Sequence, residues 1–351
     1  MMARFLLFAT ERYAIPILQP LADALGQAGH EVRGLFVDGA AGGGWPGLEH
    51  LDVHGAVQWR PSAVYSAANW VPPFIAGAKV QLFHGFNVEK RGDARGHFRV
   101  RGLFDLYCTQ GPATTAPFRE LAQRHGHFAV VETGWPKLDP LFGDEDAATR
   151  ALREPAHGRP IVMFASTFTE RLSAAPHLLD AIAREVARGD RYWLLTLHPK
   201  CSTSLFERYR ALAGPNATFF ETERLVSAQR AADVLLADTT SVVSEFVVQG
   251  KPVVTFRNRA PKPHMLDFDD PAALPGMLAR AFAPEPALQQ AIAAYAGQIH
   301  PYRDGQSSAR VIAATQALLE GRLGPLRRRP FGAFVRSLQI RRAMGYWGRG
   351  A

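Results

Sequence analysis

The chain has 351 residues, 47% of them hydrophobic and 21% charged, which excludes a disordered or collagen-like protein and predicts about two globular domains. The formal net charge of +8 lies wholly at one end. Residues 322–351 hold eight arginines and no acidic residue, so residues 1–321 balance at 32 basic and 32 acidic groups. The two cysteines, Cys108 and Cys201, exclude a disulfide framework and indicate a reducing, cytoplasmic location.

The first half of the chain predicts alternating strands and helices. Strands are expected at 4–9, 31–37, 80–84, 104–109 and 128–132, and a helix at 16–28. The first apolar run is too short for a signal peptide. The longest uncharged stretch, residues 61–78, contains three prolines, which disfavours a membrane-spanning helix.

A domain change is expected near residues 153–160, where Arg-Glu-Pro-Ala-His-Gly-Arg-Pro has the composition of a linker. The alternation then restarts. Strands are expected at 161–165, 192–197, 217–220, 234–237 and 252–256, with helices at 177–188, 205–213, 225–231 and 242–249. Because a parallel connection needs a crossover, this pattern predicts parallel sheets in two Rossmann-like domains. We expect domains at 1–152 and 160–321, and a basic tail at 322–351.

Ligands of such sheets bind beyond the carboxyl ends of the strands, and two histidines stand there. His84 follows the strand at 80–83 and precedes Gly85, so it is either a general base or a structural histidine. His198 follows the strand at 192–197 in His198-Pro199-Lys200, which is either a phosphate contact or a simple turn.

The third strand-end segment is Asp238-Thr239-Thr240-Ser241, followed by an apolar helix. Hydroxyl groups at a helix N-terminus can bind an anion, and they can equally cap the helix; the two roles are compatible. The sequence has no dinucleotide fingerprint, no Walker loop and no His-Glu-x-x-His. We therefore predict that the protein requires neither a metal nor a cofactor.

Taken together, six segments resemble one known family. They are His84-Gly85, 134–139 (Gly-Trp-Pro-Lys-Leu-Asp), His198-Pro199, 232–246, Lys251-Pro252-Val253-Val254 and 302–310. Their order and approximate spacing are similar to those of the CDP-glycerol glycerophosphotransferase family, over roughly residues 80–312. This resemblance implies an α/β fold of the GT-B type, with two Rossmann-like domains whose parallel sheets face each other across a cleft.

The resemblance also implies an activity and a set of roles. Members of the family transfer a polyol phosphate from a CDP-activated donor to an acceptor hydroxyl, here of a surface polysaccharide or a lipid-linked acceptor, and release CMP. The first domain would hold the acceptor and the second the nucleotide. The catalytic residues would be His84, as the base, and His198, at the donor pyrophosphate. Acceptor-binding residues would be Gly85, Asn87 and Lys90. Donor-binding residues would be Gly134, Pro136, Lys137, Asp238, Thr239, Thr240, Ser241, Glu245, Asp304, Ser308 and Arg310.

The sequence also departs from the family pattern. His-Gly usually continues into Thr-Pro and a pair of lysines, whereas here it continues as Phe86-Asn87-Val88-Glu89-Lys90. The polyol and the acceptor are therefore open. Two alternatives stay open as well: a UDP-sugar glycosyltransferase or UDP-GlcNAc 2-epimerase-like enzyme, and a non-catalytic nucleotide-binding scaffold.

The basic tail predicts an amphipathic helix. Phe331, Phe334, Val335, Leu338 and Ile340 fall near one helical face, and arginines occupy much of the rest. Such a helix can lie on an anionic membrane, which would place the enzyme at the inner face of the plasma membrane. The alternatives are a helix packed against the first domain and a disordered end. Nucleic acid is not expected as a partner, because the body of the protein is neutral.

Overall fold

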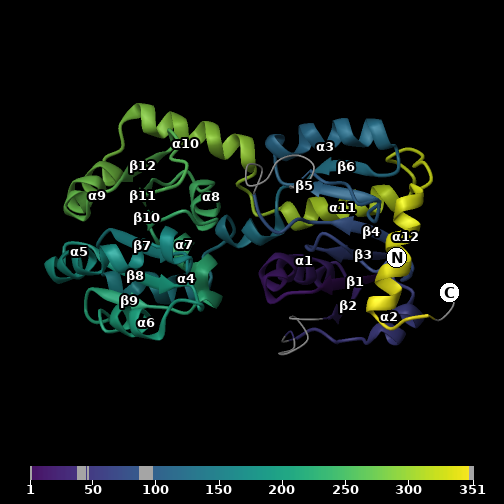
Figure 1. The fold of residues 1–351 in the computed structure, drawn as a ribbon, viewed down its shortest axis with the longest axis horizontal. Helices are drawn as coiled ribbons and strands as arrows, with labels where there is room; N and C mark the ends of the chain where they lie inside the picture. Colours follow the sequence, from purple (N-terminus) through teal and green to yellow (C-terminus); the bar gives the residue numbers. More distant parts are fainter. Residues whose placement is uncertain (1, 38–44, 46, 87–97, 348–351) are drawn as a thin grey trace. The chain divides into compact units, whose positions relative to one another are not determined.

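The computed structural model describes residues 2–37, 45, 47–86 and 98–347. The chain forms two compact units. The first comprises Met1–Asp139 together with Asp304–Ala351, and the second is the continuous segment Pro140–Arg303. Figure 1 shows the ribbon of both.

The first unit is built on a six-stranded sheet in the order β2-β1-β3-β4-β5-β6, in which every neighbouring pair is parallel. Its strands are β1 (Arg4–Ala9), β2 (Glu31–Phe36), β3 (Ala63–Ser66), β4 (Ala78–Gln81), β5 (Leu106–Thr109) and β6 (Ala129–Glu132). Its α-helices are α1 (Ile15–Gln27), α2 (Val53–Trp59), α3 (Pro112–His125), α11 (Ser307–Leu319) and α12 (Phe331–Ala343). The strands β3 and β5 are buried along their whole length, as expected where helices cover both faces of a parallel sheet.

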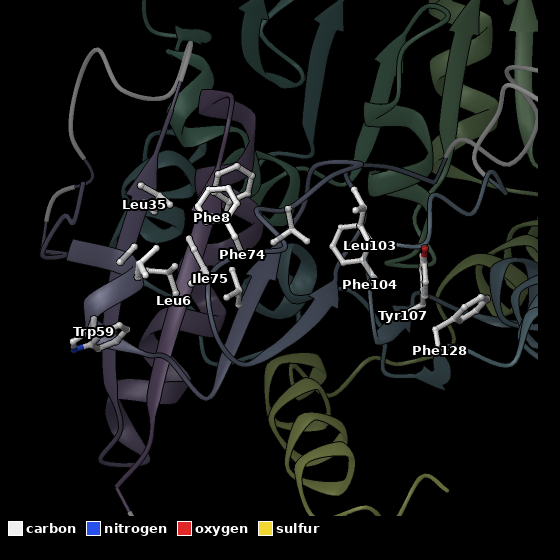
Figure 2. Close-up of a cluster of buried hydrophobic side chains, with 14 of the residues drawn as sticks. Leu6, Phe8, Leu35, Trp59, Phe74, Ile75, Leu103, Phe104, Tyr107 and Phe128 are labelled. Carbon is white, nitrogen blue, oxygen red and sulfur yellow. The ribbon is translucent and has the colours of Figure 1, made fainter. Parts of the chain in front are cut away.

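Aromatic side chains dominate the core of this unit. Figure 2 shows part of it, from Leu6 and Phe8 of β1 to Tyr107 of β5 and Phe128 beside β6. The ring of Tyr107 stacks on that of Phe118 at 4.9 Å between centroids. This dense packing gives the loops at the carboxyl edge of the sheet a rigid base.

The second unit has its own six-stranded parallel sheet, in the order β12-β11-β10-β7-β8-β9. Its strands are β7 (Ile161–Ser166), β8 (Tyr192–Leu197), β9 (Ala217–Phe219), β10 (Val234–Ala237), β11 (Val253–Phe256) and β12 (Met265–Phe268). Its α-helices are α4 (Ala147–Arg153), α5 (Ala175–Arg188), α6 (Thr203–Arg210), α7 (Leu225–Ala231), α8 (Val242–Val247), α9 (Leu274–Phe282) and α10 (Pro286–Ile299). The strand order reverses between β7 and β10, which is where ligands bind in doubly wound sheets.

The expected α/β class and the parallel sheets are confirmed, but the chain divides elsewhere than the sequence suggested. The linker-like segment at 153–160 lies inside the second unit, because α4 packs on α7. Residues after 304 return to the first unit, because α11 packs on α1, β4 and β5. Composition marks breaks in regular structure, and these need not be the places where the chain passes from one core to another.

The basic tail is a packed part of the first unit. Ile340 and Met344 contact the aromatic core, and the ring of Tyr346 stacks on Phe74 at 4.8 Å. Arg329 pairs with Asp105. In Figure 1, α12 (yellow) runs alongside the first sheet. In the part of the chain that the structure describes, no helix has the length and apolar character needed to cross a bilayer.

Candidate functional site

The turn after β4 presents His84 at the carboxyl edge of the first sheet. Phe83 has a φ of 59°, a left-handed conformation that is costly for a residue with a side chain and often marks functional loops. Its ring is buried against Phe118 at 5.1 Å. The neighbouring His84 is exposed. The loop is thus anchored by one side chain while the next remains accessible.

The hydrogen bond of His84 determines which ring nitrogen is available. Its Nδ1 lies 3.3 Å from the carbonyl oxygen of Ala67, and because a carbonyl only accepts, Nδ1 carries the proton. Nε2 is left with a lone pair. The surrounding protein lowers the pKa of His84, and the charge of Arg101 lowers it further, against the opposing effect of the Ala67 bond. At neutral pH the imidazole is therefore a neutral base.

Residues after the next two strands support this turn. Gln110, which follows β5 and is fully buried, donates from Nε2 to the carbonyl oxygen of Gly85 at 3.1 Å. The ring of Phe86 packs on Trp135, beyond β6, at 5.0 Å. Gly85, an expected acceptor-binding residue, thus has a fixed backbone. The other two, Asn87 and Lys90, lie outside the described residues.

The Gly-Trp-Pro-Lys-Leu-Asp segment forms the turn after β6. Gly134 has a φ of 78°, where a side chain would be strained, and Pro136 is buried at the start of a 3-10 helix (Pro136–Leu141). The Nζ of Lys137 lies 5.2 Å from the centre of the Trp135 ring. Gly134 and Pro136 thus shape the turn, and Lys137 is its charged group.

Asp139, the last residue of that segment, caps helix α11. Its two carboxylate oxygens accept hydrogen bonds from the backbone N–H groups of Ser307, at 2.8 Å, and Ser308, at 2.7 Å. This occupies two of the four N–H groups that a helix leaves open at its start. Ser308 is itself buried. The motif therefore joins two segments that are 168 residues apart in the sequence.

Asp304 and Arg310 form a bidentate ion pair. One guanidinium nitrogen of Arg310 lies 3.1 Å from Oδ1 of Asp304 and the other contacts Oδ2. These hydrogen bonds hold the pKa of Asp304 below its usual value. Arg310 was expected to bind the donor, and here its guanidinium is bonded to Asp304. A ligand would have to share it or compete for it.

Asp238 holds the loops of the second unit in place. Its buried carboxylate accepts hydrogen bonds from Ser166 Oγ at 2.6 Å and from the N–H groups of Thr167 and Ala174 at 3.0 and 2.9 Å. Burial raises its pKa, and these bonds oppose that shift. Asp238 thus ties the end of β10 to the end of β7 and the start of α5. In the structure Asp238 supports the residues around it, and its expected contact with the donor stays a prediction.

The residues that follow Asp238 are open to solvent to differing degrees. Thr239 Oγ1 accepts from the N–H of Arg259 at 2.9 Å, Thr240 is half-buried, and Ser241 is exposed. Helix α8 is only six residues long, and Ser241 makes no side-chain cap. Glu245 lies one turn further and is buried. Thr240 and Ser241 therefore offer hydroxyl groups at the point where the strand order reverses.

His198 occupies the neighbouring strand end, after β8. Its Nδ1 accepts from the N–H of Lys200 at 3.1 Å, so in the neutral ring the proton is on Nε2. Burial and the charge of Lys200 lower its pKa. Phe168, 44% exposed, lies beside the His198 ring at 4.5 Å, and Lys200 Nζ lies 5.4 Å from the Phe168 ring centre.

The two predicted histidines thus belong to different units and are in opposite tautomers. His84 presents a lone pair at Nε2, whereas His198 presents an N–H group at Nε2. The first arrangement suits a proton acceptor and the second a donor to a phosphoryl oxygen. Among the described residues, no three His, Cys, Asp or Glu side chains gather as a set of metal ligands.

Several supporting residues were not identified from the sequence. Ser166 ends the buried strand β7 and Thr167 follows it, a signal that could have found them, but their partner Asp238 is 72 residues away from Ser166. Gln110 also follows a strand. Phe168 and Arg259 gave no signal, because an isolated aromatic or arginine in a loop is common.

The two parallel six-stranded sheets define an α/β protein of the GT-B type. The chain resembles the wall teichoic acid polymerase TagF, at 14% identity and a TM-score of 0.66 over 92% of this chain and 90% of that one. It also resembles a putative UDP-N-acetylglucosamine 2-epimerase from Listeria monocytogenes, at 14% identity and a TM-score of 0.64 over 91% of this chain and 97% of that one. A third similar structure is the glycosyltransferase SnogD from Streptomyces nogalater, at 17% identity and a TM-score of 0.54 over 90% of this chain and 100% of that one. At these identities the likeness establishes the fold.

The sequence itself gives the family. Residues 105–315, more than half of the chain, match the model of the CDP-glycerol:poly(glycerophosphate) glycerophosphotransferase family. The chain belongs to this family and is an enzyme of the glycerophosphotransferase type. No curated protein matches it in sequence.

Proposed function

We propose that the protein transfers a polyol phosphate, glycerol phosphate or a close relative, from a CDP-activated donor to a hydroxyl of a surface-polysaccharide or lipid-linked acceptor. The observation that carries this proposal is that His84 and His198, at the carboxyl edges of two parallel sheets, are opposite tautomers: the proton is on Nδ1 of His84 and on Nε2 of His198. Phosphoryl transfer needs a positioned base and neutralisation of charge on the phosphates, and the two sites supply one each.

The reaction exchanges one phosphorus–oxygen bond for another. The acceptor oxygen attacks the phosphorus that bears the polyol, and the bond from that phosphorus to the oxygen of CMP breaks. His84 Nε2 takes the hydroxyl proton, and CMP leaves with the bonding electron pair. His198 Nε2–H, Lys200 and the hydroxyl groups of Thr240 and Ser241 would bind the pyrophosphate oxygens.

Product analysis tests the donor. We expect CMP to be released from CDP-glycerol and no UDP from UDP-GlcNAc. Release of UDP alone would favour the sugar-nucleotide alternative, for which the fold of the Listeria epimerase is the supporting observation.

Two variants test the histidines. His84→Ala and His198→Ala should each lower turnover, on the order of 10²-fold or more for a general base. The control is His157→Asn, because His157 is exposed with a φ of 50°, a conformation that asparagine tolerates. Full turnover in both alanine variants would remove both histidines from the mechanism, whereas no turnover of any donor by the wild type would favour the non-catalytic scaffold.

We further propose that α12 places the enzyme on an anionic membrane surface. The side of the helix turned away from the core exposes Phe331 (79%), Phe334 (58%), Val335 and Leu338, and Trp347 follows at 63%. Ile340, which the sequence placed on the same face, packs against the core. Large apolar side chains on a helix that also carries arginines match the chemistry of a lipid headgroup layer.

Flotation with liposomes tests this contact. Phe331→Ser with Phe334→Ser should lower binding to vesicles of phosphatidylglycerol and phosphatidylcholine about 10-fold or more, since each buried phenylalanine contributes roughly 1.5–3 kcal/mol. Leu319→Ser, which removes an exposed leucine (45%) from α11, is the control. Equal flotation of all three proteins would reject the proposal.

A further inference from the structure

The loop after β7 brings one exposed aromatic ring against two polar groups of the turn after β8. The Phe168 ring lies 4.5 Å from the His198 ring, at an angle of 40° between the ring planes. The Nζ of Lys200 lies 5.4 Å from the centre of the same ring. A cation over an aromatic face is attracted by the charge distribution of the ring. Phe168 therefore contacts both of the side chains that the proposed function assigns to the donor pyrophosphate at this turn.

The backbone on either side of Phe168 is held in place. The N–H of Thr167 donates to both carboxylate oxygens of Asp238, at 3.1 and 3.0 Å. On the other side, the N–H of Leu172 donates to the carbonyl oxygen of Thr169 at 2.8 Å, within the 3-10 turn that follows. Because the main chain is fixed before and after the aromatic residue, the place of its ring depends on its own side-chain torsions.

The turn after β8 is tied to the same loop. The N–H of Cys201 donates to the carbonyl oxygen of His198 at 2.9 Å, and its Sγ donates to the carbonyl oxygen of Thr167 at 4.0 Å. The bond from the N–H of Lys200 to Nδ1 orients the imidazole. The ammonium group of Lys200, by contrast, ends a flexible and exposed side chain. The Phe168 ring is a contact that holds this group beside the imidazole.

We propose that Phe168 is a positioning residue of the donor site, whose ring holds the Lys200 ammonium group beside the His198 imidazole so that both bind one pyrophosphate. The inference rests on the proposed function and deepens it. A phenyl ring cannot neutralise phosphate charge, so its contribution is to order the two groups before the donor arrives. Side chains that are already ordered lose less freedom on binding, which raises affinity. The ring also displaces water, and this strengthens the attraction between an ammonium group and a phosphate.

Calorimetric titration of the full-length protein tests this role without turnover. The probes are CDP and inorganic pyrophosphate. Phe168→Ala should weaken the binding of both about 5-fold or more, because two side chains must then be ordered when the ligand binds. Phe168→Tyr, which keeps the ring, should bind both probes as the wild type does. Phe168 is exposed, so both variants should keep the Tm of the wild type.

The opposite end of strand β8 offers a matched control. The guanidinium of Arg191, which directly precedes β8, lies 5.4 Å from the centre of the Phe282 ring of α9. Phe282→Ala removes the same kind of contact between a ring and a cation at the amino edge of the sheet, so the binding of both probes should stay unchanged. Equal affinity in Phe168→Ala and the wild type, or an equal loss in Phe282→Ala, would overturn the positioning role.

A measurement on the free protein separates this inference from the proposed function. Burial is the first cause of the lowered pKa of His198, and the Phe168 ring packs beside the imidazole. In Phe168→Ala, titration followed by NMR should therefore show a His198 pKa closer to 6.5, read from the imidazole resonance that His198→Ala lacks. An unchanged pKa would overturn the positioning role. If the wild type binds pyrophosphate but not CDP, the proposed donor fails and the role of Phe168 stands. If the wild type binds neither probe, both fail.

Discussion

A single backbone contact sets the chemical character of each histidine. His84 bonds to a carbonyl oxygen and His198 to an N–H group, so the same side chain type is prepared for opposite tasks. The partners, Ala67 and Lys200, contribute main-chain atoms only, so their side chains could change without altering the tautomers. The roles of these histidines therefore depend on the turn geometry.

The lowered pKa of His84 predicts how activity depends on pH. The base must be neutral, and a pKa below the usual 6.5 keeps it neutral further into the acidic range. We expect kcat/KM to be level near pH 7 and to fall only below pH 6.5, with the loss following protonation of His84. A pH–rate profile of wild type measures this. The residual activity of His84→Ala should not show this fall of kcat/KM at acidic pH. If the variant still shows the fall, another group is responsible for it.

The buried hydrogen bonds of Asp238 predict that even Asp238→Asn, a small substitution, destabilises the fold. In Asp238→Asn one acceptor oxygen is replaced by an amide that faces N–H donors, so buried donors lose their partner. We expect the free energy of unfolding to fall by about 1–3 kcal/mol. Denaturant unfolding checks this, with Asp269→Asn, an exposed position, as the control. If both variants are equally stable, the buried clamp is not needed for folding.

At the level of elements, helix α11 depends on an acid far away in the sequence. Asp139 supplies the hydrogen bonds that the helix's own N-cap, Gln306, does not. In Asp139→Ala both N–H groups lose their acceptor, and we expect a loss of about 1–2 kcal/mol in unfolding free energy. Hydrogen exchange at Ser307 and Ser308 should accelerate. Asp139→Asn, which keeps an acceptor, should restore part of the protection; identical exchange in all three proteins would contradict the capping role.

Regular elements were the most predictable part of this fold. The period of apolar residues located β1, β7, β8 and β10 to within a residue or so at each end. The short β3 and α2 were missed, because residues 53–66 mix one proline (Pro61) with polar and apolar residues without a clear period. Lys251 shows a different limit. It was noted as part of a motif, yet its Nζ donates to the carbonyl oxygens of Arg230 and Ala232 at the end of α7, which only coordinates reveal.

The sequence predicted where the candidate site residues lie better than it predicted what each of them does. Topology fixes which strand ends share an edge, so His84, His198 and Thr240 could be selected from the sequence alone. The hydrogen bonds that support the surrounding loops could not be predicted, because a bond such as that between Ser166 and Asp238 joins segments that only the folded sheet brings together. Family resemblance supplied roles, and the contacts add a supporting function for Asp238, whose donor binding stays a prediction, and for Asp139, for which no role was predicted.

At the scale of the whole molecule, the tail is needed to complete a core. Deleting residues 322–351 would uncover Phe74 and the surfaces covered by Ile340 and Met344. Because each buried apolar side chain contributes about 1.5–3 kcal/mol, the first unit should lose several kcal/mol of stability. Hydrogen exchange should accelerate in β3 and β4 and stay unchanged in β7 and β10. Unchanged exchange in β3 and β4 would mean that the tail is dispensable. Membrane contact is for this reason tested by point substitution.

The division of the chain also has a consequence for biosynthesis. Residues 140–303 are continuous, so the ribosome delivers the whole second unit before the first one is complete. The opening sheet must wait for its covering helices α11 and α12, which are translated only after the whole second unit. During that interval an apolar surface around β4 and β5 is open to chaperones or to premature association with other nascent chains.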